Sequence, residues 1–307
     1  MQPLQTLLHE IVDYAGLFPP AGLSMPEMLG NYARYLESDN RWMLGRVVVP
    51  LARLGEFASE WNQLNAGEHV TTRISLLPPP LDSGEFGAAV ESINAFNARE
   101  KSHTIDAVEV RVTDPGAVAN AAQLSESIQC FVEVPLDNRD EIISSIAGVA
   151  LPKRVFAKIR TGGVKAEMIP KATSVAEFIV ACRNAGIGMK ATAGLHHPFR
   201  AEYPLTYEPG CSVGRMHGFL NVFIGACLVY ACDLQAGVLS EFLEHAEPAD
   251  LNVTPESVSW RDYKLSSRDI AQTREAFAVS FGSCSFIEPI EDLTQLALMP
   301  ESPNAPN

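Results

Sequence analysis

The chain has 307 residues, of which 47% are hydrophobic and 20% charged, and its formal net charge is −14 at pH 7. This composition is typical of a globular protein with a large core, and no basic cluster is present that would neutralise nucleic-acid phosphates. The six cysteines form neither a CxxC pair nor a zinc-type spacing, so we expect a reduced, cytoplasmic protein.

The sequence also argues against a membrane as a partner. Residues 1–30 lack the basic and apolar regions of a signal peptide. The longest apolar run, FLNVFIGACLVYAC at 219–232, is too short to cross a bilayer and predicts a buried helix. We therefore expect no nucleic acid and no membrane as partners, and we leave open whether the chain forms a homo-oligomer.

The first 40 residues predict two helices joined by an unusual loop. Leucines recur at helical spacing in 3–13, and the glycines and prolines of AGLFPPAGL at 15–23 end that helix. The segment 13–23 is interpreted either as a lid over an active site or as a plain turn. Ser24 and Glu27 have the spacing of a capping box, which predicts a second helix that runs to about residue 38.

Strand and helix patterns then alternate six times. The predicted strands are 45–51, 72–80, 106–112, 130–136, 155–163 and 188–197. Helical patterns lie between them at 53–64, 85–98, 115–125, 139–148 and 174–185. The last of these helices has Ser174 and Glu177 at capping-box spacing and stops at Gly186. Such a succession predicts parallel strands joined by right-handed crossovers.

The remainder of the chain is less regular. It predicts one or two helices in 217–245, a seventh strand at 258–266, a helix at 267–277, an eighth strand at 278–286 and a disordered tail at 300–307. Eight units indicate an α/β protein with a single (β/α)₈ barrel over residues 1–299, with extra N-terminal helices. An open doubly wound sheet is the main alternative, but no glycine-rich dinucleotide fingerprint follows the first strand.

Polar and apolar residues alternate along most of these strands. In a barrel the outer face packs against helices and the inner face lines the lumen, so we expect the polar set to point inward. The set comprises Arg73, Ser75, Glu109, Arg111, Glu133, Lys158, Arg160, Lys190, Thr192 and His196. Its cations outnumber its two glutamates, which favours a small anionic ligand over the alternative of a self-balancing buried ion network.

The two lysines suggest a specific chemistry. Lys158 and Lys190 lie on neighbouring predicted strands, where burial and mutual repulsion are expected to lower a lysine pKa. A neutral amine forms a Schiff base with a carbonyl compound. Glu133 or Glu109 would then move protons during cleavage of a carbon–carbon bond.

The same segments resemble a known family. FAKIRTGG at 156–163, followed by MKATAGLHHP at 189–198, resembles the two lysine strands of the deoxyribose-phosphate aldolase family, class I aldolases with a (β/α)₈ barrel. SFGSCS at 280–285 is similar to that family's late phosphate-binding turn. The resemblance covers 154–200 and 278–286 and implies that Lys158 forms the Schiff base, with Lys190 beside it and Gly282 and Ser283 holding an anion.

The first hypothesis is therefore a lyase of the aldolase type that needs no cofactor. Its catalytic residues are Lys158, Lys190, Glu133 and Glu109. Its substrate-binding residues are Arg73, Arg111, Arg160, Thr192, Gly194, His196, Gly282 and Ser283.

Two other hypotheses remain open. His196, His197 and Glu133 contain the donor atoms of a divalent-metal site, which would make the chain a metal-dependent lyase or hydrolase. Two adjacent histidines face opposite ways in a strand, so this site requires the strand to end before Pro198. The third hypothesis is a barrel that binds a small molecule without catalysis.

Overall fold

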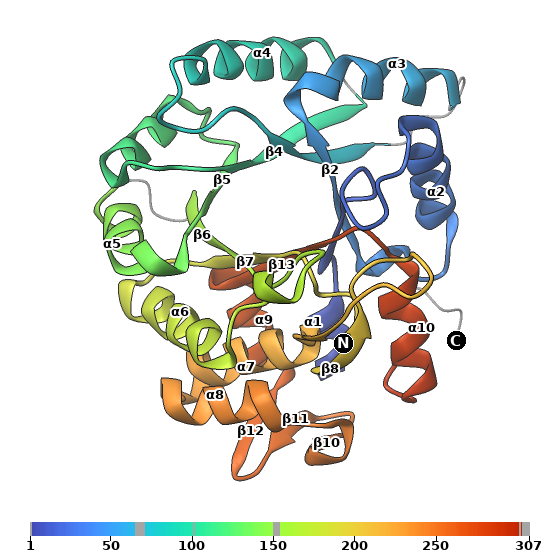
Figure 1. The fold of residues 1–307 in the computed structure, drawn as a ribbon, viewed down its shortest axis with the longest axis vertical. Coiled ribbons are helices and arrows are strands. Elements are labelled where there is room, and N and C mark those ends of the chain that lie inside the picture. Colours follow the sequence, from blue (N-terminus) through green and yellow to red (C-terminus); the bar gives the residue numbers. More distant parts are fainter. Residues whose placement is uncertain (1, 65–70, 101, 150–153, 301, 303–307) are drawn as a thin grey trace.

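The computed structural model describes residues 2–64, 71–100, 102–149, 154–300 and 302, and within them eight parallel strands close into a barrel (Figure 1). Around the barrel these strands are β1 (Val12–Tyr14), β13 (Ala278–Ser283), β7 (Met189–Thr192), β6 (Val155–Arg160), β5 (Gln129–Glu133), β4 (His103–Val110), β3 (Thr72–Leu77) and β2 (Leu44–Pro50). Each neighbouring pair is parallel, which confirms the predicted (β/α)₈ class.

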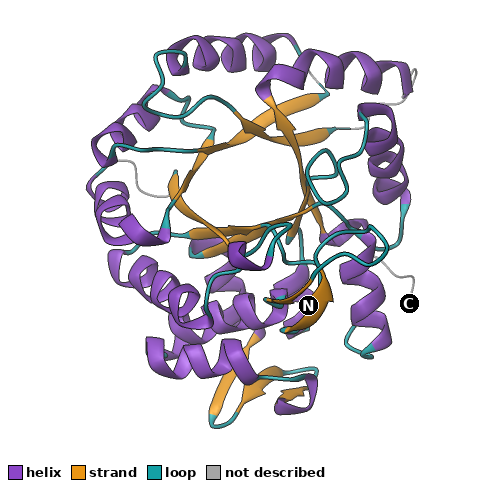
Figure 2. Cartoon of the chain, viewed as in Figure 1, coloured by secondary structure: helices purple, strands orange, loops and turns teal. Residues whose placement is uncertain are grey.

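Helices surround the barrel (Figure 2). The apolar outward side chains of the strands form one hydrophobic core with apolar residues of these helices. The helices are α1 (Pro3–Leu8), α2 (Met25–Glu37), α3 (Leu54–Leu64), α4 (Phe86–Arg99), α5 (Arg139–Gly148), α6 (Ala172–Ala185), α7 (Phe219–Cys232), α8 (Ala236–His245), α9 (Ser267–Ala276) and α10 (Ile287–Gln295). The predicted helix at 115–125 is a 3₁₀ segment, Pro115–Gln123. The apolar helix α7 is buried because it packs against β13, α6, α8 and α9. Among the described residues, no helix is long and apolar enough to traverse a bilayer.

The prediction of one long helix at 3–13 was wrong. The helix α1 ends at Leu8, and the chain then enters the barrel as β1, a strand of three residues. Val12 pairs with Phe281 of β13 and with Leu44 of β2, so β1 closes the ring between the last and second strands. A strand this short leaves no periodic pattern in the sequence, and its pairing partners supply its structure.

The predicted seventh strand, 258–266, was also wrong. These residues form β11 (Ser257–Trp260) and β12 (Tyr263–Ser266), an antiparallel hairpin that also pairs with β10 (Leu251–Val253) outside the barrel. The chain reverses at Arg261, which has a φ of 52°. Trp260 packs edge-on against Phe242 of α8, so the apolar residues of this hairpin cover the outer helix layer.

The predicted helix ends have mixed outcomes. Ser24 caps α2 in the predicted capping box with Glu27. The capping box at Ser174 was wrong, because α6 already begins at Ala172 and has Lys171 at its N-cap. Gly186 ends α6 as predicted, with a left-handed φ of 69° that lets its N–H reach the last carbonyls of the helix.

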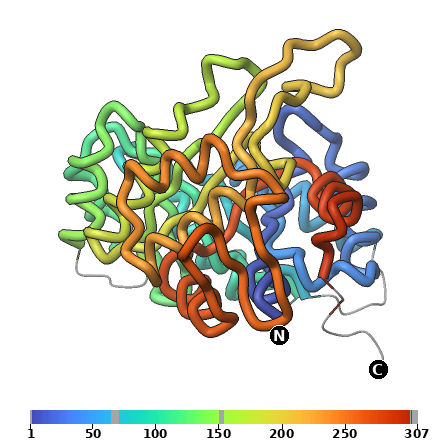
Figure 3. The backbone as a smooth tube through the Cα atoms, turned by 90° about the horizontal axis from the view of Figure 1, so that it is seen from below, coloured from blue at the N-terminus to red at the C-terminus, as the bar shows by residue number. Residues whose placement is uncertain are grey.

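A hairpin extends beyond the C-terminal ends of the barrel strands. After β7 the chain forms this hairpin of β8 (Ala201–Pro204) and β9 (Val213–Met216), whose gold loop rises above the rest of the chain in Figure 3. Parts of the predicted tail at 300–307, namely 301 and 303–307, lie outside the described residues.

Candidate active site

A cavity of about 520 Å³ opens at the C-terminal end of the barrel. Its apolar wall is formed by Phe18, Pro19, Pro20, Leu77, Pro78, Pro80, Met168, Leu205 and Met216. The segment 13–23 therefore does border the cavity, as the lid interpretation required. The lining also includes the polar residues Glu109, Arg111, Glu133, Lys158, Arg160, Thr192 and His196 and the glycines Gly194 and Gly282, all of which the sequence singled out.

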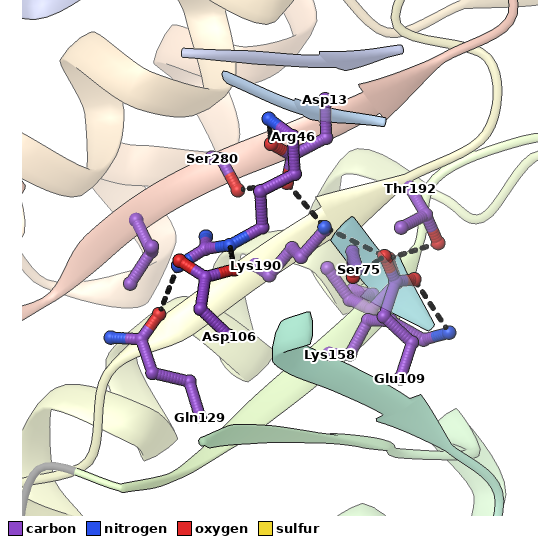
Figure 4. A network of polar contacts seen from close by, with 12 residues as sticks. Asp13, Arg46, Ser75, Asp106, Glu109, Gln129, Lys158, Lys190, Thr192 and Ser280 are labelled. Carbon is purple, nitrogen blue, oxygen red and sulfur yellow. Dashed lines mark hydrogen bonds and ion pairs between the residues drawn. The ribbon is translucent and has the colours of Figure 1, made fainter. Parts of the chain in front are cut away.

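Charges of alternating sign run from the barrel interior to this cavity. Lys190 Nζ contacts the Asp13 carboxylate and lies 2.7 Å from Glu109 Oε1. Glu109 Oε2 lies 3.2 Å from Lys158 Nζ, which is also 3.0 Å from Glu133 Oε2. Figure 4 shows the inner part of this network, in which Glu109 lies between the two lysines.

Lys190 is the inner of the two lysines and is fully buried. Burial by itself lowers its pKa, but Asp13 and Glu109 outweigh burial and raise the pKa above the ordinary lysine value. The expectation of a lowered pKa is therefore wrong for Lys190, which remains an ammonium ion. Its Nζ lies 5.2 Å from the centre of the Phe131 ring, which stacks with Phe156 one layer deeper in the lumen.

Glu109 is an anion at neutral pH in this network. Burial raises its pKa, but Lys190 and Lys158 outweigh burial and bring the pKa to about 2. The Ser75 hydroxyl donates a further hydrogen bond of 2.9 Å to Glu109 Oε1. A carboxylate held in this way is a poor proton acceptor at neutral pH, which leaves Glu133 as the better candidate for proton transfer.

The sequence analysis missed Asp13. Its carboxylate accepts the backbone N–H of Arg46 at 2.7 Å and the Ser280 hydroxyl at 2.7 Å, in addition to its contact with Lys190. Burial raises the Asp13 pKa, but Lys190 and Arg46 outweigh burial and lower it. The sequence does contain a signal for Asp13, a single acidic residue inside the apolar run IVDYAG. It was overlooked because these residues were interpreted as the end of a helix and the start of a loop.

Lys158 is the lysine that a ligand can reach. It lines the cavity, whereas Lys190 lies beneath it. The side chain of Lys158 is only 5% exposed, because Glu109 and Glu133 enclose the ammonium group. The cavity therefore exposes one amine between two carboxylates.

Arg160 is the cation best placed to bind an anionic ligand. It lies on β6 two residues after Lys158, is half-buried, and lines the same cavity. Among the described residues, no hydrogen bond or ion pair engages its side chain. Arg111 also lines the cavity, but it is 72% exposed and lies 3.6 Å from Glu133.

The prediction that Arg73 points into this site was wrong. Arg73 pairs with Glu10 at 2.6 Å and borders a different pocket, together with Arg46 and Arg274. It precedes Ser75 by two residues on β3, which places it nearer the N-terminal end of the barrel. Alternation assigned the correct face to Arg73 but not its depth along the barrel axis.

The ends of β6 and β7 approach each other closely beside the cavity. Ala193 and Gly194 have left-handed φ values of 64° and 76°, so the chain leaves the barrel right after Thr192. A Cβ atom on Gly194 would lie 2.9 Å from the Gly162 Cα. His196 reaches the cavity through this turn, not through strand alternation as predicted.

The residues predicted to bind a metal ion do not meet. His197 contacts Asp292 at 2.6 Å and stacks on Tyr203, with 3.5 Å between ring centres. Glu133 is engaged by Lys158, and His196 faces Glu288. In the part of the chain that the structure describes, no three His, Cys, Asp or Glu side chains gather as a metal-binding group.

The predicted anion-binding turn is divided between two environments. Gly282 lines the cavity, whereas the Ser283 hydroxyl is buried 3.3 Å from His196 Nδ1. That hydroxyl also accepts the backbone N–H of Ser285 at 3.2 Å. Of the turn's two residues, Gly282 therefore borders the space that a ligand would fill.

Several barrel strands thus contribute side chains to one cavity at their C-terminal ends, the usual position of catalytic sites in barrels of this type. The same fold carries many unrelated reactions, so the architecture alone assigns no chemistry. Comparison with known proteins finds no family model that matches this chain and no curated protein with significant similarity to it.

Proposed function

We propose that this protein is a lyase of the aldolase type, in which Lys158 forms a Schiff base with a small anionic carbonyl compound. One observation carries the proposal: the Lys158 amine borders the cavity between two carboxylates, and a second, fully buried lysine stands behind it. The proposal agrees with the resemblance of 156–163 and 189–198 to the deoxyribose-phosphate aldolase family.

The first step is loss of a proton from the Lys158 ammonium group. Glu133 Oε2, at 3.0 Å, is the acceptor within reach that only one lysine engages. The free amine then attacks the carbonyl carbon, and the carbinolamine loses water to form a protonated imine. The imine restores a positive charge between Glu109 and Glu133, so the site is electrostatically complementary to it.

Cleavage of the carbon–carbon bond uses the same groups. A base removes the proton of the substrate's β-hydroxyl group, and the bonding electrons move toward the imine nitrogen to leave an enamine. Glu133 is the base closest to this nitrogen that borders the cavity with Lys158. Lys190 keeps its proton throughout and holds Glu109 in place.

Arg160 supplies the affinity for a negatively charged substrate. A guanidinium group that no described residue engages is available to bind a carboxylate or a phosphate through paired hydrogen bonds. Arg160 lies two residues beyond Lys158 on β6 and lines the same cavity, which supports its role as the partner of the ligand's anionic group.

Borohydride trapping tests the proposal. The protein is incubated with small aldehydes, keto acids and sugar phosphates, reduced with borohydride, and analysed by intact-mass and peptide mass spectrometry. We expect a substrate-sized adduct on Lys158 that is absent from Lys158→Met and retained in Lys165→Met, a matched change of an exposed lysine.

Two results would contradict this function. Ligand binding without any reducible adduct or turnover would favour a binding barrel. Turnover without an adduct, abolished by a chelator, would favour the metal-dependent alternative.

A further inference from the structure

A cysteine and a histidine contact each other in the lining of the same cavity. Cys284 and His196 both line it, with 3.9 Å between Cys284 Sγ and His196 Nε2. The other ring nitrogen, Nδ1, lies 3.2 Å from Glu288 Oε2. The imidazole therefore has a thiol at one nitrogen and a carboxylate at the other, the arrangement by which a base activates a nucleophile and a third group orients the base.

The barrel brings these three residues together from separate segments. β7 and β13 are neighbours, with Thr192 paired to Gly282, so the loops that follow them carry His196 and Cys284 to the same place. Glu288 lies in the first turn of α10. The Tyr207 hydroxyl, from the loop of the β8–β9 hairpin, donates a 2.8 Å hydrogen bond to Glu288 Oε2 and fixes that carboxylate.

The contacts of His196 and Glu288 favour the charged forms of both side chains. Burial lowers the His196 pKa, but Cys284 and Glu288 outweigh burial and raise it to about 9. Burial raises the Glu288 pKa, but His196 and Tyr207 lower it below its ordinary value. At neutral pH this assigns a positive charge to His196 and a negative charge to Glu288. An imidazolium beside a thiol stabilises the thiolate.

The other titratable groups around Cys284 do not oppose this pairing. Burial raises the pKa values of the Tyr14 and Tyr207 phenols, so both stay uncharged. The His197 ring lies 6.3 Å from the His196 ring and is held by Asp292.

Cys284 is buried like Cys130, Cys182 and Cys227, but of these four it is the one that lines the cavity. Burial raises the pKa of Cys130 and of Cys227 to about 12, and it also raises that of Cys182. Cys211 lies outside the cavity lining, and its thiol contacts the Thr206 carbonyl. A thiol that combines burial, access to the cavity and an imidazole neighbour is a candidate nucleophile.

We propose that Cys284, activated by His196 and oriented by Glu288, is a second nucleophile of this cavity and adds to small anionic aldehydes. The thiolate sulfur forms a bond to the carbonyl carbon, the π electrons move to the oxygen, and the imidazolium donates its Nε2 proton to that oxygen. The product is a hemithioacetal, and the step needs no oxidant or second reactant. The choice of an aldehyde as the ligand rests on the proposed function. The reactivity of the Cys284 thiolate is inferred independently, from the positions of Cys284, His196 and Glu288.

The rate at which iodoacetamide alkylates Cys284 tests the thiolate. In the intact protein we expect labelling that is still fast at about pH 6, well below the ordinary cysteine pKa of about 8.5. His196→Gln should slow Cys284 labelling at about pH 6 by tenfold or more, an estimate from the loss of thiolate. Glu288→Gln should slow it less.

Two controls accompany this measurement. Asp292→Asn removes another acid of α10, one that faces His197, and should leave the Cys284 rate unchanged. Cys211, read from the same digests, should react equally in all variants and so serves as the internal standard for the labelling reaction. The proposal of a thiolate at Cys284 is refuted if alkylation of Cys284 in the unmodified protein has the pH dependence of an ordinary cysteine. It is also refuted if His196→Gln leaves the alkylation rate unchanged.

Glyoxylate, a small anionic aldehyde, tests the addition step. We expect glyoxylate to protect Cys284 from alkylation in the unmodified protein and in Lys158→Met, whereas glycolate, which has the same charge but no carbonyl group, does not protect. Equal protection by glycolate, or loss of protection in Lys158→Met, overturns the aldehyde addition. Failure of borohydride trapping at Lys158 with Cys284 still protected would refute the imine function alone.

Discussion

The buried ammonium group of Lys190 contacts the carboxylate of Asp13, although the two residues are separated by 177 positions in the chain. Both side chains are almost completely removed from solvent. Two charges buried together are tolerated because each cancels much of the other's desolvation cost. The contact also connects β1, the shortest barrel strand, to β7, and Glu109 connects Lys190 in turn to Lys158, the candidate Schiff-base lysine.

Removal of one member of this pair should be more harmful than removal of both. We expect Asp13→Asn to lower the free energy of unfolding by about 3–5 kcal/mol, because it leaves a buried charge with one carboxylate partner fewer. The double variant Asp13→Asn with Lys190→Met should recover part of this loss. Urea denaturation of the four proteins of the cycle measures the coupling, and a coupling energy near zero would contradict the pairing.

Acid should destabilise the protein through Glu109. Its pKa falls from 4.5 to about 2 on folding, so the ionised form adds stability above pH 4.5, and this stability is lost as pH falls toward 2. The shift corresponds to about 3 kcal/mol. Unfolding free energies measured from neutral pH to about pH 2 should therefore decline less steeply in Glu109→Gln than in the unmodified protein. Parallel curves for the two proteins would show that Glu109 makes no such contribution.

Arg160 should serve ligand binding and not stability. Because no described residue engages its side chain, we expect Arg160→Met to change the unfolding free energy by less than about 0.5 kcal/mol. The concentration of anionic carbonyl compound needed for half-maximal borohydride trapping should rise by about tenfold or more. Arg268→Met, a change of an exposed arginine on α9, is the matched control and should leave trapping unchanged. Equal trapping curves for Arg160→Met and the unmodified protein would remove Arg160 from the binding site.

Gly194 should be replaceable only at a considerable cost. An alanine there would adopt a φ of 76° and place its Cβ 2.9 Å from Gly162 Cα, so strain and a backbone clash add together. Gly186→Ala is the matched control, because its φ is 69° but nothing lies within 4 Å of the new Cβ. We expect about 1–2 kcal/mol of destabilisation at Gly186 and more at Gly194. Thermal unfolding compares the two, and equal losses would show that the close approach costs nothing.

The sequence by itself determined which face of each long strand is polar. Alternation is a local property of an extended chain, so Glu109, Arg111, Glu133, Lys158 and Arg160 were assigned to the cavity before any contact was known. The succession of strand and helix patterns likewise indicated the barrel, because parallel strands require crossover connections.

Only the tertiary structure decided how far along the barrel axis each side chain lies and which groups it meets. Arg73 has the predicted face but the wrong end, since depth depends on the register between strands. The residues of 258–266 have a strand pattern that fits both a barrel strand and an outer hairpin, and only the pairing of β10 to β12 separates the two.

The charge states of the site also depend on contacts distant in sequence. Lys190 is an ammonium ion because of Asp13 and Glu109, and His196 is charged because of Cys284 and Glu288. Each pair joins segments that are far apart in the chain, and pKa values respond to distance in space and to burial. Residue types and periodicity therefore indicated most of the polar residues that line the cavity, whereas the packing of the barrel determined their protonation and their partners.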